Sequence, residues 1–218
     1  MDSCNNKRSL LDIPCLPAAG LMVGSLATIL AGMALVATVA ASPSVCRPCT
    51  LERVEAAMVR LKQPYTDDPV ISDATYRREI AEATLTASAE SNVPALFLTG
   101  LFFRESSFRK AVLEGRRRGT RGEMGLGQLH GVAKWWCQKS GFNLKTINGQ
   151  ARCSAGWLDR CRKQCDGSLE QGFARYATGR SCSPGFAGDV LTDRFSVWRA
   201  LEDGTPIPKP PKHKGGKR

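Results

Sequence analysis

A strongly apolar stretch, residues 92–108, constrains the fold more than any other part of the chain. Asn92 is a helix-capping residue type, and Pro94 suits a first helical turn, where its missing N–H leaves no bond unmade. Residues 95–103 are almost wholly apolar and contain no charged side chain. Because a helix that is apolar all round is buried, the stretch predicts a helix inside the core of a folded domain.

A single acid, Glu105, stands near the end of this predicted helix. Apolar surroundings and the negative end of the helix dipole both disfavour a carboxylate anion, so both raise its pKa. A general acid that works near neutral pH needs such a shift. The alternative is that Arg104 or Arg109 pairs with Glu105 and the acid merely ends the helix. On this stretch alone the alternative is the simpler interpretation.

The N-terminal part carries a second apolar run, because residues 13–45 contain no charged side chain. Within it, residues 16–41 exceed the roughly 20 residues that a membrane-spanning helix needs. Residues 39–41 resemble a signal-peptidase site, but the run is longer than a usual signal core, so we favour a retained anchor. Lys7 and Arg8 precede the run, which predicts a cytoplasmic N-terminus and an extracytoplasmic, membrane-anchored or secreted remainder.

The composition adds two constraints. The net charge of +11 favours anionic partners, namely nucleic acid, acidic lipid or an anionic cell-wall polymer. Seven of the nine cysteines follow the apolar N-terminal run, which indicates an oxidising compartment if that run directs export. The Cys46–Cys49 pair has neither a second pair at metal spacing nor a thioredoxin-like context, so we interpret it as a local structural feature or half of a disulfide.

Helical periodicity dominates the rest of the chain, and no strand-like alternation of useful length is present. The predicted fold class is therefore mainly α. Ser72 or Asp73 is expected to cap the first helix of the compact domain. The other expected helices cover residues 50–62, a segment through Trp135 and Trp136, and residues 151–165, 169–176 and 190–201.

Three short segments carry the chemistry, and they occur in a fixed order. Residues 105–108 read Glu-Ser-Ser-Phe, residues 122–128 read Gly-Glu-Met-Gly-Leu-Gly-Gln, and residues 174–179 read Ala-Arg-Tyr-Ala-Thr-Gly. Together they resemble the soluble lytic transglycosylase family, whose lysozyme-like helical domain cleaves peptidoglycan glycan strands. The resemblance covers residues 72–201, roughly. Each segment alone is a weak signal, and the specificity lies in all three occurring in order on a helical background.

The resemblance implies that Glu105 is the sole catalytic acid/base. It would protonate the glycosidic oxygen between N-acetylmuramic acid and N-acetylglucosamine and then take the proton of the C6 hydroxyl, which closes a 1,6-anhydro ring. The same resemblance makes Ser106, Glu123, Gln128 and Tyr176 candidate substrate-binding residues, Ser106 either by touching the sugar or by setting the helix end. It implies neither a metal nor a cofactor, and peptidoglycan strands are the expected partner.

Three residues bear on how closely the chain follows the family. Ala177 replaces the usual Asn, which puts one substrate contact in doubt, and Gly127 replaces the usual Met, which removes part of an apolar cleft wall. Glu123 occurs in some members only. We favour a structural role for Glu123, in which it orients its turn or pairs with an arginine. In the second role it would hold a water molecule across the cleft. The second role would make the protein a hydrolytic lysozyme, because ordinary glycosidases use two acids.

An exported domain favours disulfides over metal for the cysteines from Cys137 to Cys182. Cys161 or Cys165, which share a helix face, is expected to reach Cys182, and Cys137 is a candidate partner of Cys153. A non-catalytic wall-binding or nucleic-acid-binding protein is the least favoured alternative, because no nucleic-acid module is recognisable. The predicted organisation has five parts: a polar segment (1–12), an anchor or signal segment (13–45), a juxtamembrane helix and linker (46–71), the catalytic domain (72–202) and a basic disordered tail (203–218).

Overall fold

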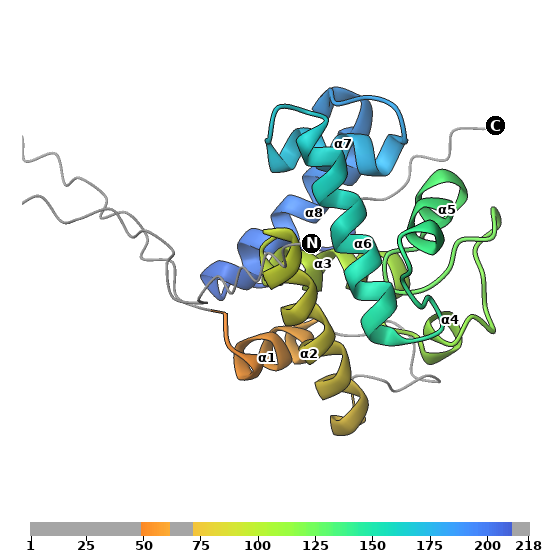
Figure 1. Ribbon diagram of the computed structural model, residues 1–218. Helices are drawn as coiled ribbons and strands as arrows, with labels where there is room; N and C mark the ends of the chain where they lie inside the picture. Colours follow the sequence, from red (N-terminus) through yellow and green to blue (C-terminus); the bar gives the residue numbers. More distant parts are fainter. Residues whose placement is uncertain (1–48, 62–71, 211–218) are drawn as a thin grey trace, which may run out of the picture. The chain divides into compact units, whose positions relative to one another are not determined.

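The structure, a computed structural model, describes residues 49–61 and 72–210. Within these residues the chain forms eight α-helices and no β-strand, and one isolated bridge pairs Met124 with Leu129. The prediction of a mainly α-helical fold is confirmed. The helices, coloured along the chain in Figure 1, are α1 (Leu51–Arg60), α2 (Ala74–Ser91), α3 (Ala95–Ser106), α4 (Lys110–Leu113), α5 (Gly131–Lys139), α6 (Ile147–Lys163), α7 (Leu169–Thr178) and α8 (Pro184–Asp203).

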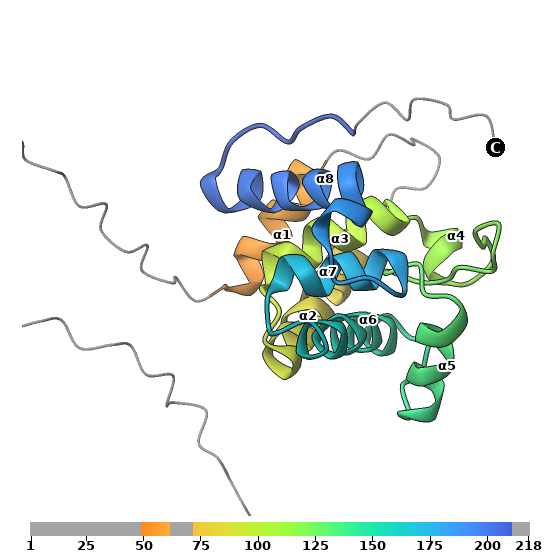
Figure 2. The ribbon, with the colours of Figure 1, turned by 90° about the horizontal axis from the view of Figure 1, so that it is seen from above.

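Helix α3 forms the centre of the core, as its sequence predicts. Every residue from 95 to 103 is buried. Figure 2 shows α3 between α8 on one side and the α2–α6 pair on the other. The ring of Phe97 on α3 lies 5.9 Å from that of Phe173 on α7 and 5.1 Å from that of Phe195 on α8. These aromatic contacts fix α3, the helix that carries Glu105, against α7 and α8, the last two helices of the chain.

Helices α2 and α6 lie side by side in both Figure 1 and Figure 2 and form the most extensive helix pair. Asp73 caps α2 by accepting hydrogen bonds from the backbone N–H groups of Thr75 (2.9 Å) and Tyr76 (3.1 Å). Of the two candidates for this cap, the structure therefore selects Asp73. Thr146 caps α6 in the same way, and its hydroxyl accepts from the N–H of Gly149 at 3.1 Å.

Helix α1 packs against α2 and α3 rather than standing apart from the domain. Val54, Met58 and Leu61 are fully buried and share one hydrophobic core with α3. The periodicity that predicted an amphipathic helix is thus matched by burial of its apolar face. The helix assigned from sequence to a juxtamembrane segment is consequently part of the compact domain.

Two disulfides fasten the part of the domain around α6. Cys137 on α5 is bonded to Cys153 on α6, and Cys165 is bonded to Cys182, with 5.5 Å between the Cα atoms in each pair. The first bond links α5 to α6, and the second links the end of α6 to the segment between α7 and α8. Cys161 is buried with a free thiol, so Cys165 is the partner of Cys182.

Asn92 has a different role from the one expected. It ends α2 in the left-handed conformation (φ 55°), which asparagine adopts more readily than most residues, and it does not cap α3. Pro94 occupies the residue before α3, without a side-chain capping bond. Only Val93 separates Asn92 from Pro94, so the end of α2 and the start of α3 lie within the same short segment.

The C-terminal region also differs from its prediction. Helix α8 starts at Pro184, because Gly188 (φ 44°) permits a kink that joins an extra turn to the expected helix. Beyond α8, residues 204–210 are held against the domain instead of being disordered. The guanidinium of Arg60 donates to the carbonyl of Thr205, that of Arg104 donates to the carbonyl of Pro208 at 2.7 Å, and Ile207 packs on the core.

The anchor or signal segment predicted for residues 13–45 lies outside the described residues. Among residues 49–61 and 72–210, no helix has the length and apolar character of a membrane span.

Candidate active site

Glu105 lies in the last turn of α3, at the boundary between the core and solvent. The helix ends at Ser107, which adopts a left-handed conformation (φ 51°) and whose N–H bonds the carbonyl of Phe103 at 2.7 Å. The side chain of Glu105 is 23% exposed. A carboxyl group in this position is fixed by a buried helix yet accessible from outside.

Arg194 on α8 is the ionic partner of Glu105. Its Nη2 atom lies 2.8 Å from Glu105 Oε1, and its Nε atom lies 3.3 Å from the same oxygen. The sequence had pointed to Arg104 or Arg109 as the partner, but Arg104 pairs with Asp193 instead, at 2.9 Å. Arg194 belongs to none of the recognised motifs and is 89 residues away in the chain. Only the helical periodicity of its segment could have placed it near the core.

Asp193 connects the two arginines into a buried charge network. Its side chain is 3% exposed, and its two oxygens contact Arg104 and Arg194 separately. Burial lowers the pKa of Arg104, and attraction to Asp193 opposes that shift. The network therefore runs Arg104, Asp193, Arg194, Glu105, and it fixes the end of α3 against α8.

The Gly-Leu-x-Gln turn is held by hydrogen bonds within itself and from α6. The backbones of Met124 and Leu129 pair with each other, and Gln128 (φ 48°) donates from its side chain to the carbonyl of Gly125 at 3.0 Å. Gln150, only 1% exposed, accepts from the N–H of Leu126 at 3.1 Å. The turn is thus preformed, and sequence analysis missed Gln150 because it lies in no motif.

Tyr176 links the third segment to this turn. Its hydroxyl donates to the carbonyl of Gly127 at 2.8 Å. Burial raises the pKa of Tyr176, and the negative charge of Glu105 raises it further, while a hydrogen bond with Ser154 opposes both. The phenol therefore stays neutral and remains a donor. A hydrogen bond thus joins the second and third sequence segments, and Glu105 of the first segment acts on Tyr176 through its charge.

The glycine at position 127 has a steric explanation. A Cβ atom built there would lie 2.4 Å from the hydroxyl oxygen of Ser154 and 2.6 Å from that of Tyr176. A side chain such as the methionine of the family pattern does not fit this packing. The departure from the pattern thus accompanies a direct contact between the turn and Tyr176.

Ser106 and Glu123 are engaged with their own backbones. The Ser106 hydroxyl, in a residue that is 3% exposed, donates to the carbonyl of Phe102 and accepts from the N–H of Phe108, which terminates the helix. Glu123 accepts from the N–H of Arg121 at 2.7 Å. Desolvation raises the pKa of Glu123, but the backbone N–H donors of Glu123 and Arg121 outweigh it, so the net shift is downward. Glu123 is therefore an anion that shapes its own loop.

A groove of about 570 Å³ opens beside the turn. Gln128 and Tyr176 line it, whereas Glu105, Ser106 and Glu123 are not among the described residues that do. Tyr176 thus forms part of the groove wall while its hydroxyl lies in the field of Glu105. In the described part of the chain, no three His, Cys, Asp or Glu side chains gather in a way that suits a metal ion.

Comparisons with known proteins add no relative. No protein-family model matches the chain, and neither the curated proteins nor the solved structures contain a significant match.

Proposed function

We propose that this protein is a peptidoglycan lytic transglycosylase in which Glu105 is the catalytic acid/base. One observation carries the proposal: a partly exposed carboxyl group at the end of a buried helix lies within electrostatic reach of Tyr176, whose hydroxyl is bonded to the Gly125–Gln128 turn. The turn and the Tyr176 segment are separated in sequence, so their convergence is a property of the fold. The convergence supports both the lysozyme-like architecture and the family assignment that the sequence suggested.

The proposed reaction needs no water. Glu105 donates its proton to the glycosidic oxygen, and the bond between that oxygen and C1 of N-acetylmuramic acid breaks. The carboxylate then removes the proton from the C6 hydroxyl, and O6 bonds to C1. One carboxyl group thus serves as acid and then as base, and its proton is restored. The product carries a 1,6-anhydro ring and the atoms of the substrate are all accounted for.

Arg194 contributes to this cycle through its contact with Glu105. Its contact with Glu105 compensates the negative charge that remains after proton donation. General acid catalysis starts from the protonated carboxyl, however, so the contact has to loosen when substrate binds. Asp193, which also pairs with Arg104, holds Arg194 nearby, so that Arg194 can pair with Glu105 again after the reaction. We therefore assign Arg194 a positioning role rather than a catalytic one.

The state of Glu123 favours transglycosylation over hydrolysis. A hydrolytic lysozyme-like mechanism would use a second carboxylate to activate water. The carboxylate of Glu123 accepts a hydrogen bond from the backbone N–H of Arg121 in its own loop, which occupies one of its oxygens. Hydrolysis remains the second candidate because Arg121, which precedes Glu123 by two residues in the same loop, lines the groove. The two disulfides support an extracytoplasmic location for the domain, as proposed from the N-terminal segment.

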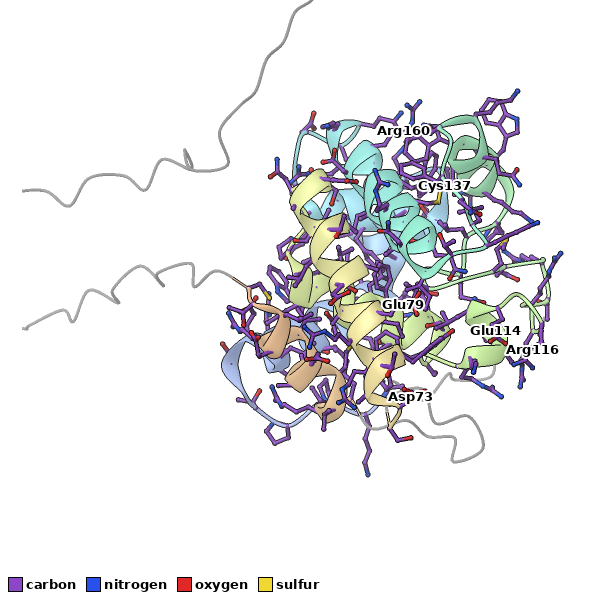
Figure 3. The ribbon with its side chains drawn as sticks, turned by 60° about the horizontal axis from the view of Figure 1, so that its bottom comes forward. Asp73, Glu79, Glu114, Arg116, Cys137 and Arg160 are labelled. Carbon is purple, nitrogen blue, oxygen red and sulfur yellow. A yellow bond between two sulfur atoms is a disulfide. The ribbon has the colours of Figure 1, made fainter. Side chains whose placement is uncertain are left out.

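Digestion of purified sacculi tests the proposal, with the products analysed by mass spectrometry. The full chain is expected to release anhydro-ended muropeptides, and Glu105→Gln is expected to reduce their release by at least about 100-fold. Glu114→Gln is the matched control, since Glu114 lies on the surface beside Arg116 (Figure 3) and pairs with it at 2.6 Å. Products that contain an oxygen from solvent would favour hydrolysis. Absence of product from the unaltered protein would rule out both enzymatic functions.

A further inference from the structure

The groove beside Gln128 combines aromatic and cationic side chains. Its walls include Trp135, Trp136 and Trp157, together with Arg121, Arg160 and Arg175. No aspartate or glutamate occurs among the described residues that line it. A neutral sugar chain would need the aromatic surface but not three guanidinium groups.

The arginines of the groove are available to a ligand. None of Arg121, Arg160 and Arg175 forms an ion pair with an acidic side chain of the described residues, whereas Arg152 and Arg194 do. Arg175 is held in place by neutral acceptors, with its Nε atom 2.9 Å from the side-chain oxygen of Gln164 and its Nη1 atom 3.1 Å from the carbonyl of Arg180. Its charge is therefore fixed in position without being neutralised.

The tryptophans form a firm wall with an exposed rim. The rings of Trp136 and Trp157 lie 5.6 Å apart and pack on a small core around the Cys137–Cys153 disulfide. Trp135 on α5 is 59% exposed and extends this wall outward. Figure 3 shows Arg160 on α6 at the same side of the molecule as Cys137 on α5. Indole faces and cationic groups thus occur within one concave surface.

We infer that this groove binds the anionic peptide stems of the glycan strand, with stem carboxylates on the arginines and the adjoining sugar on the tryptophans. The inference rests on the proposed function and specifies its substrate: peptide-bearing strands rather than bare ones. Arginine suits the role because its planar guanidinium bonds a carboxylate with two parallel N–H groups. Arg160 and Arg175 are the specificity-determining residues, and they act apart from Glu105.

Binding, measured apart from catalysis, tests the inference. Glu105→Gln in the full chain, kept in detergent, is sedimented with intact sacculi and with sacculi whose peptides have been removed by an amidase. Removal of the peptides is expected to weaken binding about tenfold, which corresponds to about 1.4 kcal/mol. Adding Arg160→Gln and Arg175→Gln should abolish the difference between the two kinds of sacculi. The matched control, Arg116→Gln with Arg117→Gln, should preserve it.

Other outcomes overturn the inference in distinct ways. Equal binding to both kinds of sacculi, or an equal loss in the control, would mean that only bulk charge attracts the wall. Tighter binding to a single-stranded oligonucleotide than to peptide-bearing strands, with dependence on Arg160 and Arg175, would assign the groove to nucleic acid. Arg160→Gln alone is a second variant in case the double variant misfolds. It is expected to fold normally, because the Arg160 side chain is exposed and no hydrogen bond or ion pair joins it to the described residues. Selective binding without any anhydro product from the unaltered protein would refute the proposed function and leave the groove assignment intact.

Discussion

At the scale of single residues, the ion pair between Glu105 and Arg194 decides how the site is arranged. The pair joins the last turn of α3 to the middle of α8, two helices that are far apart in the chain, and Asp193 holds Arg194 from its other side. Removing Arg194 leaves the buried carboxylate of Asp193 with one charged partner fewer, which costs more than the contact itself contributes. Replacement of Arg194 is therefore expected to affect both stability and activity.

We expect Arg194→Met to lower the free energy of unfolding by about 1–3 kcal/mol, because Asp193 loses one of its two partners. It should also reduce kcat for anhydro product by about tenfold with little change in KM, because Glu105 loses its orientation. Arg194→Lys retains the charge but not the guanidinium fork, so its stability and its kcat should lie between those of the unaltered protein and those of Arg194→Met. Urea unfolding and steady-state kinetics check both quantities, with Arg199→Met on the exposed face of α8 as control. An unchanged kcat in Arg194→Met would remove the positioning role.

Position 127 offers a purely steric test. Gly127→Ala places a Cβ atom against the hydroxyls of Ser154 and Tyr176, so one of them has to move. We expect a loss of about 1–3 kcal/mol in the free energy of unfolding, as is usual for overpacking. Gly185→Ala is the control, since the nearest atom to its Cβ would be 3.8 Å away. Thermal melting of the two variants measures the difference, and equal melting temperatures would mean that the turn can relax without cost.

At the scale of helices, much of the fold follows from local patterns. The all-apolar stretch predicts α3, and Asp73 predicts the start of α2, because burial and capping depend on residues near each other in sequence. The start of α8 was missed because the kink at Gly188 joins two segments that separately look like a turn and a helix. Asn92 was misassigned because its residue type suits both ends of a helix.

The site was predictable only where motifs mark it. Glu105, Gln128 and Tyr176 lie in recognisable segments, and a hydrogen bond joins the segments of the last two. Arg194 and Gln150 act across the fold, and their positions depend on how α8 and α6 pack rather than on any local pattern. Long-range polar partners of this kind become visible only once the helices have been assembled.

Helix α6 carries a buried free thiol close to one disulfide, which allows a test by pH. Burial raises the pKa of Cys161 to about 11, well above the ordinary thiol value of about 8.5. The folded state thus disfavours the thiolate. The stability that the neutral thiol of Cys161 contributes is therefore complete below the ordinary pKa and is lost as the pH rises towards 11. Between pH 9 and 11, roughly, the native protein should lose more stability than Cys161→Ala.

Alkylation gives the same test a second measurement. Iodoacetamide at pH 8 should leave Cys161 unmodified in the native protein and modify it after unfolding, because the thiolate is the nucleophile that attacks the reagent and displaces iodide. Peptide mapping without reduction should recover the Cys165–Cys182 link. Rapid labelling of Cys161 in the native protein, or a Cys161–Cys182 link, would contradict the arrangement around α6.

At the scale of the whole molecule, the segment after α8 ties together parts of the domain that are distant in sequence. Arg60 on α1 donates to the carbonyls of Ala200 and Thr205, and Arg104 on α3 donates to Pro208. Arg104 also contacts Asp193 and thereby belongs to the network that ends at Glu105. The C-terminal segment is thus connected to the candidate site through a single arginine.

Two truncations test whether this segment contributes to the domain. Ending the chain after Gly204 removes the acceptors of Thr205 and Pro208, and we expect the free energy of unfolding to fall by about 1–3 kcal/mol, since hydrogen bonds to charged groups are the stronger kind. Ending it after Pro210 removes basic residues but retains both acceptors, so stability should change by less than about 0.5 kcal/mol. Urea unfolding of the two proteins separates the effects. Equal losses would attribute stabilisation to the terminal charges, whereas a larger loss on ending after Gly204 would show that the segment is a structural part of the domain.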